Sequence, residues 1–513
     1  MEISSITHQL QPLYVSVLCF LFFAYFLIKW LTSLLATQKN SPPSPPKIPI
    51  LGNLHQLGLH PHRSLMSLGQ RYGPLMMLHF GSKPVLIVSS AEAAREIMKT
   101  HDLVFANRPK LSVTDKLLYN SKDVASAPYG EYWRQMRSIC VLHLLTNKRV
   151  QSFKNVREEE VNFMIEKIHK FSSSSLPVNL SEMFACLAND VICRVAFGKK
   201  YRGEDGKKFQ KLLGEFMRLL GSFDVAVFIP WLSWIHWISG FDAKADRTAK
   251  EFDEFIEGIL EEHINNGRTV TDGKEVPNDF VHVLLELQKE SNNSKSEFSL
   301  ERENIKALIL DMFVGGSDTS STVLEWAMTE LIRHPRAMKK LQSEIKAIAP
   351  EKSNITEADL DKMQYLKLVI KEALRFHVPF PLLAARECMQ DINILGFQVP
   401  AGTMVLINAW ALARDSKLWS KPEEFWPERF LDNPIDFKGH DFEFIPFGAG
   451  RRGCPGMPFA MSIIELVLAN LVNNFEWELP GGMKGEDLDV DESVGITTSR
   501  KNPLLAIAIP ISH

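Results

Sequence analysis

The chain has 513 residues, a net charge of −3, and 45% hydrophobic and 23% charged residues, a composition typical of a globular protein. The small negative charge and the lack of a basic stripe with interleaved aromatic residues argue against nucleic-acid binding. The six cysteines form no Cys-x-x-Cys pair, so we expect a reducing compartment and no zinc site.

An uncharged, mostly apolar stretch lies close to the N-terminus, at residues 9–28. About twenty such residues span a bilayer. A cleaved signal peptide is the alternative, but no basic n-region and no small-residue cleavage site are present. Positive charges at residues 29, 39 and 47 follow the span and predict a cytosolic location for the rest of the chain. We therefore expect a single N-terminal transmembrane anchor within residues 1–35.

A proline-rich run, Ser41-Pro42-Pro43-Ser44-Pro45-Pro46-Lys47-Ile48-Pro49, follows this stretch. Such a run adopts the stiff polyproline II conformation and cannot continue a helix. We interpret residues 36–50 as a hinge between the anchor and a single domain formed by residues 51–513. A ligand for an SH3-type module is the alternative.

The first part of this domain combines a predicted hairpin with a long loop. Residues 75–80 and 84–89 are predicted strands. Residues 108–129 have no clear period and contain two prolines, which favours a long loop, and long loops in compact domains are often functional. Trp133 and Arg137 follow on a predicted helix and share one of its faces, because they are four residues apart.

Residues 150–350 are dominated by helical patterns. Residues 216–238 are rich in Phe, Trp, Ile and Leu. They could form core, a membrane-dipping surface or a substrate entrance, and core is the simplest interpretation.

A long apolar helix is predicted from about residue 300 to residue 334, with Ser299 as its N-cap and Pro335 at its end. Its middle reads Gly315-Gly316-Ser317-Asp318-Thr319-Ser320. Two glycines inside a helix cost roughly 1 kcal/mol each against alanine, so this segment conflicts with its own helix. Such conflicts tend to mark functional sites, although a kink in a crowded core is the alternative.

The next predicted helix, residues 363–376, carries Glu372 and Arg375 on one face. Such a pair by itself indicates a solvated ion pair. Short apolar runs at residues 392–394 and 404–407 predict strands. The sequence Pro427-Glu428-Arg429-Phe430 lies in a region without helical period.

The most specific motif is Phe447-Gly448-Ala449-Gly450-Arg451-Arg452-Gly453-Cys454-Pro455-Gly456, directly before a predicted helix at residues 457–475. Thiolate is the form of cysteine that binds metal, and nearby arginines and a helix N-terminus both lower a thiol's pKa. Glycines let the backbone approach a flat ligand closely. A buried structural cysteine after a glycine-rich turn is the alternative. The spacing of Phe447, Gly450, Arg452, Cys454 and Gly456 resembles the haem-binding loop of the cytochrome P-450 monooxygenases.

This resemblance implies a mainly α fold with smaller β-sheets, the cytochrome P-450 fold, preceded by one transmembrane helix. It implies haem b with the Cys454 thiolate as the iron ligand and Phe447, Gly450 and Gly456 around it. Propionate contacts are implied for four residues: Arg452, Trp133, Arg137 and Arg386. Ala385 stands where the family commonly has a proline.

Further roles follow from the same resemblance. Asp318 and Thr319 occupy the acid and alcohol positions of the oxygen-activating segment and would deliver protons. Glu372, Arg375 and Arg429 would form a structural network behind the cysteine loop. The expected substrate pocket is apolar and contains no charged residue: Val113, Phe313, Val314, Val378, Phe380, Leu382, Leu383, Val494 and Ile496.

The implied activity is monooxygenation of a hydrophobic small molecule, such as a terpenoid or a coumarin-like aromatic, by an enzyme of plant specialised metabolism. Electrons would come from NADPH through a flavoprotein reductase, with cytochrome b5 as a second candidate donor. The expected location is the endoplasmic reticulum membrane, with a cytosolic catalytic domain. A reductase-independent haem-thiolate isomerase or dehydratase and a non-catalytic haem sensor are the alternatives.

Overall fold

The computed structural model describes residues 40–174, 176–201, 203–266, 279–293 and 298–512, with six residues between positions 16 and 25. Apart from those six, the predicted anchor in residues 1–35 lies outside the described residues. Within the described part of the chain, one helix, α20 (Met457–Asn474), is long and apolar enough to cross a membrane, but most of it is buried in the protein. We assign α20 to the core of the domain.

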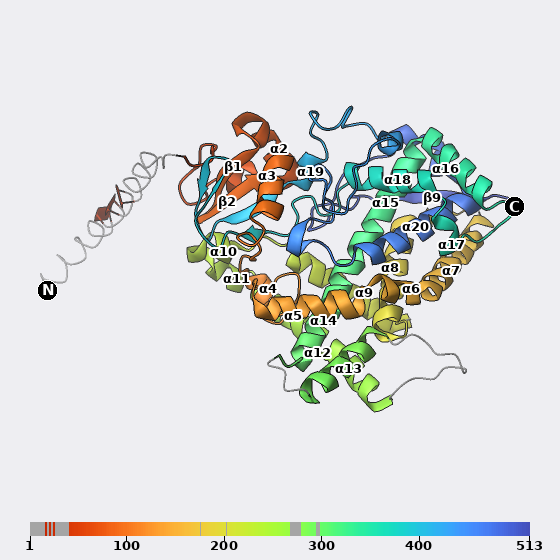
Figure 1. The fold of residues 1–513 in the computed structure, drawn as a ribbon, viewed down its shortest axis with the longest axis horizontal. Helices are drawn as coiled ribbons and strands as arrows, with labels where there is room; N and C mark the ends of the chain where they lie inside the picture. Colours follow the sequence, from red (N-terminus) through yellow and green to blue (C-terminus); the bar gives the residue numbers. More distant parts are fainter. Residues whose placement is uncertain are drawn as a thin grey trace, which may run out of the picture.

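The described chain is mainly helical, as the sequence predicts (Figure 1). The other helices are α2 (Pro61–Tyr72), α3 (Ala91–Arg95), α4 (Ser112–Leu117), α5 (Glu131–Ile139), α6 (Asn147–Ser152), α7 (Lys154–Ser172), α8 (Leu180–Phe197), α9 (Gly203–Leu220), α10 (Val225–Phe228), α11 (Trp234–Ile238), α12 (Phe241–Asn266), α13 (Phe280–Asn293), α14 (Arg302–Gly316), α15 (Asp318–Arg333), α16 (Pro335–Ile348), α17 (Glu357–Leu360), α18 (Gln364–Phe376) and α19 (Ala409–Leu412).

The strands form three small sheets. In the largest, the order is β1-β2-β7-β4, with β2 and β7 parallel and the other pairs antiparallel. The second has the order β3-β9-β8, and β5 pairs with β6 in the third. The strands are β1 (Leu75–Phe80), β2 (Lys83–Val88), β3 (Val178–Asn179), β4 (Arg386–Glu387), β5 (Ile392–Ile394), β6 (Phe397–Val399), β7 (Met404–Ile407), β8 (Phe475–Glu478) and β9 (Leu505–Pro510).

The core is organised around α15, which is buried along almost its whole length. It packs against α8, α18 and α20, and Figure 1 shows these helices beside one another away from the main sheet. Because α20 is also apolar all round, it can be covered by helices on every side. The helices therefore form one thick layer, with the main sheet at its edge.

The long helix predicted for residues 300–334 is interrupted at Ser317, between α14 and α15. The two glycines before the break have different surroundings. A Cβ on Gly316 would lie 2.6 Å from the Cδ1 of Ile192, so glycine lets α8 approach closely. A Cβ on Gly315 would meet nothing within 4 Å. The N-cap is Glu301, which forms a capping box with Asn304, so the prediction of Ser299 is wrong.

Two other expectations about local structure are wrong. The predicted loop at residues 108–129 contains α4, which packs on α9 and α12. The proline run does not stand clear of the domain as a spacer. The carbonyl of Pro43 accepts a hydrogen bond of 2.9 Å from the amide of Met77 in β1, and Asn53 donates to the carbonyls of Pro45 and Pro46. Proline lacks an N–H but keeps its carbonyl, so the run can serve as an acceptor along the sheet.

The Glu372 carboxylate lies at the centre of a fully buried ionic network. It forms two hydrogen bonds of 2.8 Å with Arg375 and one of 3.0 Å with Arg429. The amide of Trp426 donates a fourth, at 2.8 Å. Arg375 uses its remaining donors on the carbonyls of residues 413, 422 and 424. The structure thus brings together the three predicted network residues and ties α18 to residues 413–430.

Aromatic contacts connect this network to the cysteine loop. The ring of Phe430 lies 5.5 Å from that of Phe444, and Phe444 contacts Phe437 at 6.3 Å. Phe437 in turn contacts Phe447, the first residue of the loop, at 5.6 Å. Ring pairs at these separations add packing energy beyond simple burial. The position of the loop therefore depends on the ionic network behind it.

Replacement of Glu372 by glutamine is expected to destabilise the protein by about 3–5 kcal/mol, because it leaves two buried arginines without their anion. The measurement is the thermal unfolding midpoint together with the yield of folded protein. Glu424→Gln is the matched control, because its side chain pairs only with Lys421 at the surface, where both are exposed. Equal stability of the two variants would contradict the central role of Glu372.

Candidate cofactor and active site

Glycines and one backbone hydrogen bond shape the loop at residues 447–456. The amide of Cys454 donates to the carbonyl of Phe447 at 2.9 Å, which closes the loop on itself. Gly450 has a φ of +67°, and a Cβ there would lie 2.3 Å from the carbonyl oxygen of Met98. Only glycine combines that backbone conformation with so close an approach.

Cys454 lies in the loop just before the start of α20, beside the amides of Gly456 and Met457. Protein atoms surround it, yet the residue keeps accessible surface. Burial raises the pKa of the Cys454 thiol, while the amides of Gly456 and Met457 and the charge of Arg137 oppose this shift. The lowering contributions expected from a nearby arginine and a helix N-terminus are present, but burial outweighs them. A metal ion bound to the sulfur would reverse the balance, since a coordinating thiol is deprotonated.

Arg452 and Trp133 form a stacked pair beside the loop. The guanidinium lies 4.2 Å from the centre of the indole ring, and both side chains donate to the carbonyl of Val124. Arg137, one turn beyond Trp133 on α5, donates to the carbonyl of Gly453 at 2.6 Å. These three residues, singled out from the sequence, therefore meet at the cysteine loop.

Arg386 approaches the loop from β4. It donates to the carbonyl of Ala449 at 2.8 Å and pairs with Asp102 at 3.2 Å. The same Asp102 accepts from Arg451 at 2.9 Å. Ala385, at the position of the usual proline, keeps an ordered path, since its carbonyl accepts a hydrogen bond of 2.7 Å from Arg108.

Arg108 is a site residue that sequence reasoning missed. Its other acceptors are the carbonyls of Ala125 and Ala384. Burial and the nearby charges of Arg452 and Arg386 lower the pKa of Arg108 well below its usual value. Burial, Arg386 and Arg137 likewise lower the pKa of Arg452 to about 9. Four arginines therefore repel one another in one place.

The hydrogen-bond partners of these arginines indicate whether a haem fits. Among the described residues, the hydrogen-bond acceptors of Arg108, Arg137 and Arg452 are main-chain carbonyls. Such a cluster is complementary to carboxylates, which form charge-assisted bonds with guanidinium groups. Haem carries two propionates, and Cys454 offers a sulfur in the loop to which Arg137 and Arg386 are hydrogen-bonded. The residues therefore fit a haem with a cysteine ligand.

Thr319 and Asp318 lie at the start of α15 but have different partners. The hydroxyl of Thr319 donates to the carbonyl of Gly315 at 2.6 Å. The carboxylate of Asp318 accepts from the hydroxyl of Thr497 in the C-terminal segment. Burial raises the pKa of Asp318, and the bond from Thr497 opposes that shift. The structure thus places the alcohol beside the exposed Gly315 and directs the acid toward Thr497.

Asp311 is a second residue that the sequence prediction missed. It lies one turn before Gly315, on the face that also carries Thr319, since these positions are four apart. Its carboxylate accepts from the amide of Val124 at 2.6 Å. Burial and the adjacent Asp123 raise the pKa of Asp311 well above its usual value. This face of α14 therefore carries a carboxyl group.

The predicted pocket residues divide into two groups. Five of them line one cleft of about 240 Å³ between the end of the α18 segment and the C-terminal turn: Phe380, Leu382, Leu383, Val494 and Ile496. Val113 and Val378 are buried instead, and Val314 is partly buried against the main core. Phe313 stacks on Phe197 with ring centres 4.9 Å apart. It belongs to the core because it lies on a different face of α14 from Gly315.

A mainly helical domain in which arginines converge on a loop that carries a cysteine is typical of haem-thiolate proteins. Comparison with known proteins gives the family. The model of the family Cytochrome P450 matches residues 42–506, and the chain belongs to this family. Its members are oxidoreductases with a haem iron held by a cysteine thiolate.

Several plant proteins resemble the chain over nearly its whole length. Cytochrome P450 736A117 of Prunus mume is 53% identical, and the alignment covers 99% of this chain and 98% of the relative. Cytochrome P450 71A6 of Nepeta racemosa is also 53% identical, with 97% and 99% covered. Norfluorocurarine oxidase of a Strychnos species is 49% identical, with 97% and 98% covered.

Arg108→Gln is expected to speed haem loss by about 10-fold or more, because a charged hydrogen bond to a propionate disappears. The same change is expected to have a smaller effect on the stability of the haem-free protein, since the lost hydrogen bonds to three carbonyls are offset by relief of the repulsion from Arg452 and Arg386. Haem transfer to an acceptor protein and thermal unfolding measure the two effects. Arg134→Gln, an exposed arginine paired with Glu131, is the control. Parallel losses of haem retention and haem-free stability would contradict this assignment.

Proposed function

We propose that the chain is a membrane-anchored monooxygenase that oxidises a hydrophobic small molecule with O2 and electrons from NADPH. The single observation that carries the proposal is the convergence of Arg108, Arg137, Arg386 and Arg452 on the loop that holds Cys454. A flavoprotein reductase is the proposed electron donor, with cytochrome b5 as a second donor. Its docking face is proposed on the cysteine-loop side, where the side chain of Arg451 is 47% exposed.

Bound haem supplies the activation of O2 that amino-acid side chains cannot perform. The residues of the chain hold and insulate it. The sulfur of Cys454 is the proposed ligand of the iron, and Phe447, Gly450 and Gly456 shape the loop around it. Arg108, together with the predicted Arg137, Arg386 and Arg452, is proposed to bind the propionates. Trp133 keeps the plane of Arg452 in place by stacking.

Proton delivery is proposed for the start of α15. The hydroxyl of Thr319 lies beside the open side of Gly315 and can exchange the proton that it donates to the Gly315 carbonyl. Burial raises the pKa of Asp318, which favours its protonated form. The hydroxyl of Thr497 contacts Asp318 and gives this acid a fixed orientation.

The proposed substrate is a hydrophobic plant metabolite such as a terpenoid or a coumarin-like aromatic. The support is the apolar character of the cleft formed by Phe380, Leu382, Leu383, Val494 and Ile496. One relative is named for the oxidation of norfluorocurarine, which supports oxidation of a small molecule. Asp311 adds one polar group to the face of α14 and would favour a substrate with a hydroxyl or carbonyl group.

The two alternative functions do not need the proton-delivering residues that the chain contains. A reductase-independent isomerase or dehydratase and a haem sensor need no proton delivery to bound oxygen. Thr319, bonded to the carbonyl of Gly315, and Asp318, bonded to the hydroxyl of Thr497, favour monooxygenation over both. Consumption of NADPH in the presence of substrate and reductase discriminates among the three.

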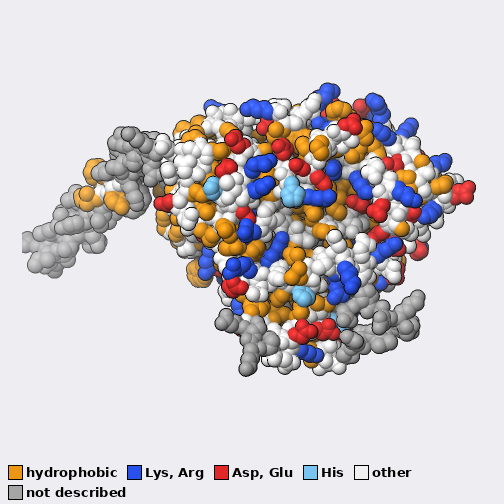
Figure 2. Space-filling view, in the orientation of Figure 1, with side chains coloured by type: hydrophobic (Ala, Val, Ile, Leu, Met, Phe, Trp, Pro, Cys, Tyr) orange, Lys and Arg blue, Asp and Glu red, His pale blue; other side chains and the backbone are white. Residues whose placement is uncertain are grey.

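Membrane association is supported by an exposed apolar surface around α11, which we call the tryptophan patch. Trp231, Trp234 and Trp237 are 52%, 55% and 78% exposed. The expectation that residues 216–238 are core is wrong for these three. Figure 2 shows hydrophobic side chains along the edge of the molecule where Figure 1 places α10 and α11. Tryptophan is the residue that prefers the membrane–water interface.

The tryptophan patch lies close to the point where the proposed anchor joins the domain. The carbonyl of Leu51 accepts from the amide of Gly81 at 3.2 Å, and the next amide, of Ser82, donates to the carbonyl of Phe228 at the end of α10. Residues 48, 50 and 51 are themselves exposed apolar residues. One side of the domain therefore presents apolar groups from both segments, and we propose that residues 1–35 anchor this side to the endoplasmic reticulum membrane, with residues 36–50 as the connection.

Trp237→Phe is expected to reduce the quenching of tryptophan fluorescence by brominated lipids when the full chain is reconstituted in vesicles, because this indole would enter the interface. Trp426→Phe is the matched control, since Trp426 is 42% exposed but stacks with Arg429 far from α11 in sequence. A similar change in quenching for both variants would argue against membrane contact of the tryptophan patch.

Thr319→Ala is expected to lower the product formed per NADPH by about 10-fold or more, with hydrogen peroxide released instead, because a positioned proton donor is lost. Thr319→Ser keeps the hydroxyl and should restore coupling. Each variant is first checked by the carbon monoxide difference spectrum of the reduced protein, which should keep the thiolate-type Soret band and lose it only in Cys454→Ala. Unchanged coupling in Thr319→Ala would refute the proton-delivery role, and absence of the band in the folded wild type would refute the function.

A further inference from the structure

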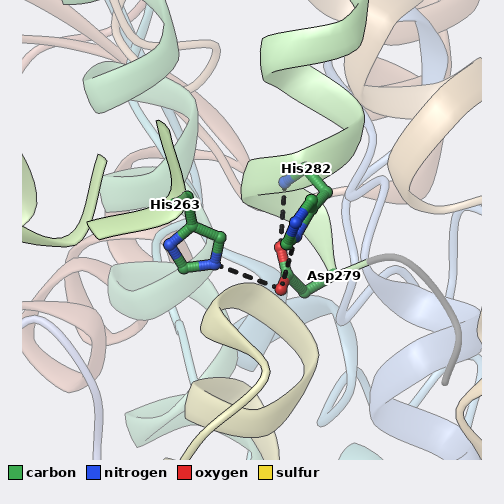
Figure 3. Close-up of side chains that lie close together, drawn as sticks. All are labelled: His263, Asp279 and His282. Atoms are coloured by element: carbon green, nitrogen blue, oxygen red, sulfur yellow. Dashed lines mark hydrogen bonds and ion pairs between the residues drawn. The ribbon is translucent and has the colours of Figure 1, made fainter. Parts of the chain in front are cut away.

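Three side chains that can bind a metal ion, two histidines and one aspartate, converge between α12 and α13, outside the haem site. His263 lies in the last turn of α12, and Asp279 and His282 flank the start of α13. Their ligand atoms all lie within 4.8 Å of one another. Figure 3 shows both imidazole rings directed at the same carboxylate oxygen of Asp279. His263 and Asp279 have side chains that are only 7% and 8% exposed.

The hydrogen bonds of His263 require a cation on the side that faces Asp279. Its Nδ1 lies 2.8 Å from the carbonyl oxygen of Ile259. A carbonyl can only accept, so Nδ1 carries the hydrogen and the neutral ring has its lone pair on Nε2. That Nε2 lies 3.2 Å from Oδ2 of Asp279, which is also an acceptor. Two lone pairs repel each other unless a second proton or a metal ion lies between them.

The orientation of His263 is the one that metal-binding histidines adopt. Such a residue almost always donates its other ring N–H to a carbonyl or carboxylate, which fixes the ring and the tautomer. In His263 the fixed donor is Nδ1, and Nε2 is the atom that could bind a metal ion. The ring is therefore already oriented for a metal ion on the Asp279 side.

Two further contacts hold Asp279 in place. Its Oδ1 accepts from the amide of His282 at 2.9 Å and so caps α13, while Oδ2 remains for the two imidazoles. A Cβ added to Gly198 would lie 2.9 Å from Oδ2, so the glycine that ends α8 leaves the space for this oxygen. The carboxylate cannot turn away without losing the cap.

The spacing of the three ligand atoms is close to that of a tetrahedral zinc site. Bonds of about 2.0–2.1 Å to zinc place neighbouring tetrahedral ligands about 3.3 Å apart. Oδ2 of Asp279 lies 3.2 Å from Nε2 of His263 and 2.9 Å from Nδ1 of His282. Only the distance between the two histidines has to shorten. Imidazole nitrogen with one carboxylate oxygen is a donor set suited to zinc.

We propose that His263, Asp279 and His282 form a structural site for one Zn²⁺ ion, with water as its fourth ligand. Cysteine spacing in the sequence could not indicate this site, because its ligands include no cysteine and come from two separate parts of the chain. The ion would fasten the end of α12 to the start of α13. This site is independent of the haem and of the proposed oxidation.

The test counts and titrates zinc on the haem-bearing full chain, purified without a histidine tag and freed of metal by a chelator. Zinc chloride is the probe, and competition with a chromophoric chelator gives the affinity. We expect one zinc ion per chain and a rise in the thermal unfolding midpoint. His263→Gln and Asp279→Asn should each weaken binding by about 10-fold or more. His143→Gln, which changes an exposed histidine elsewhere, should bind zinc as the wild type does.

Two results would overturn the site. One is wild-type protein that binds no more zinc than Asp279→Asn, in which case His263 holds a second proton instead. The other is zinc on the wild type whose K-edge absorption shows no imidazole ligands, a measurement that needs no variant to fold. The carbon monoxide spectrum of every protein should be unchanged, so a failure of the haem function is distinguishable from a failure of the zinc site.

Discussion

The carboxylate of Glu372 is the contact on which the geometry of the catalytic side depends. It is buried with no exposed surface and receives four hydrogen bonds, three from arginines and one from a backbone amide. A buried anion is tolerated only when its oxygens are fully satisfied, so the segments that supply these donors cannot move independently. Because the rings of Phe430, Phe444, Phe437 and Phe447 continue from this network to the cysteine loop, the position of the sulfur is set by an interaction that touches no ligand.

Local sequence signals predicted the parts of the molecule that depend on neighbours along the chain. The hairpin of β1 and β2, the strand β7 and the helix α20 follow from short patterns of apolar residues and turn residues. The cysteine loop belongs to the same group, since its glycines, its closing hydrogen bond and its sulfur lie within ten residues. The sequence also indicated a disturbance near Ser317, because two glycines and an aspartate conflict with the helix that contains them.

Features that depend on contacts between distant segments could not be predicted from the sequence. Arg108 lies in a stretch without period, and its partners come from residues 125 and 384–385, so no local signal marks it. Phe313 was placed in the pocket because the pattern around the break does not show which face of α14 is open. The structure settles this point through Gly315, whose face carries Asp311 and Thr319. His263 and Asp279 come together only because α12 packs beside α13. The sequence of either helix alone does not show that contact.

The arginine cluster also affects how much of the protein is expected to accumulate in a cell. Arg108, Arg137, Arg386 and Arg452 lie together with only partial compensation from Asp102 and Asp123, so the newly made chain carries a local repulsion that bound propionates would relieve. A ligand that binds the folded state alone raises its population by mass action, and chains left unfolded are removed by proteases. The amount of this protein is therefore expected to follow the supply of newly synthesised haem, even when its messenger RNA is constant.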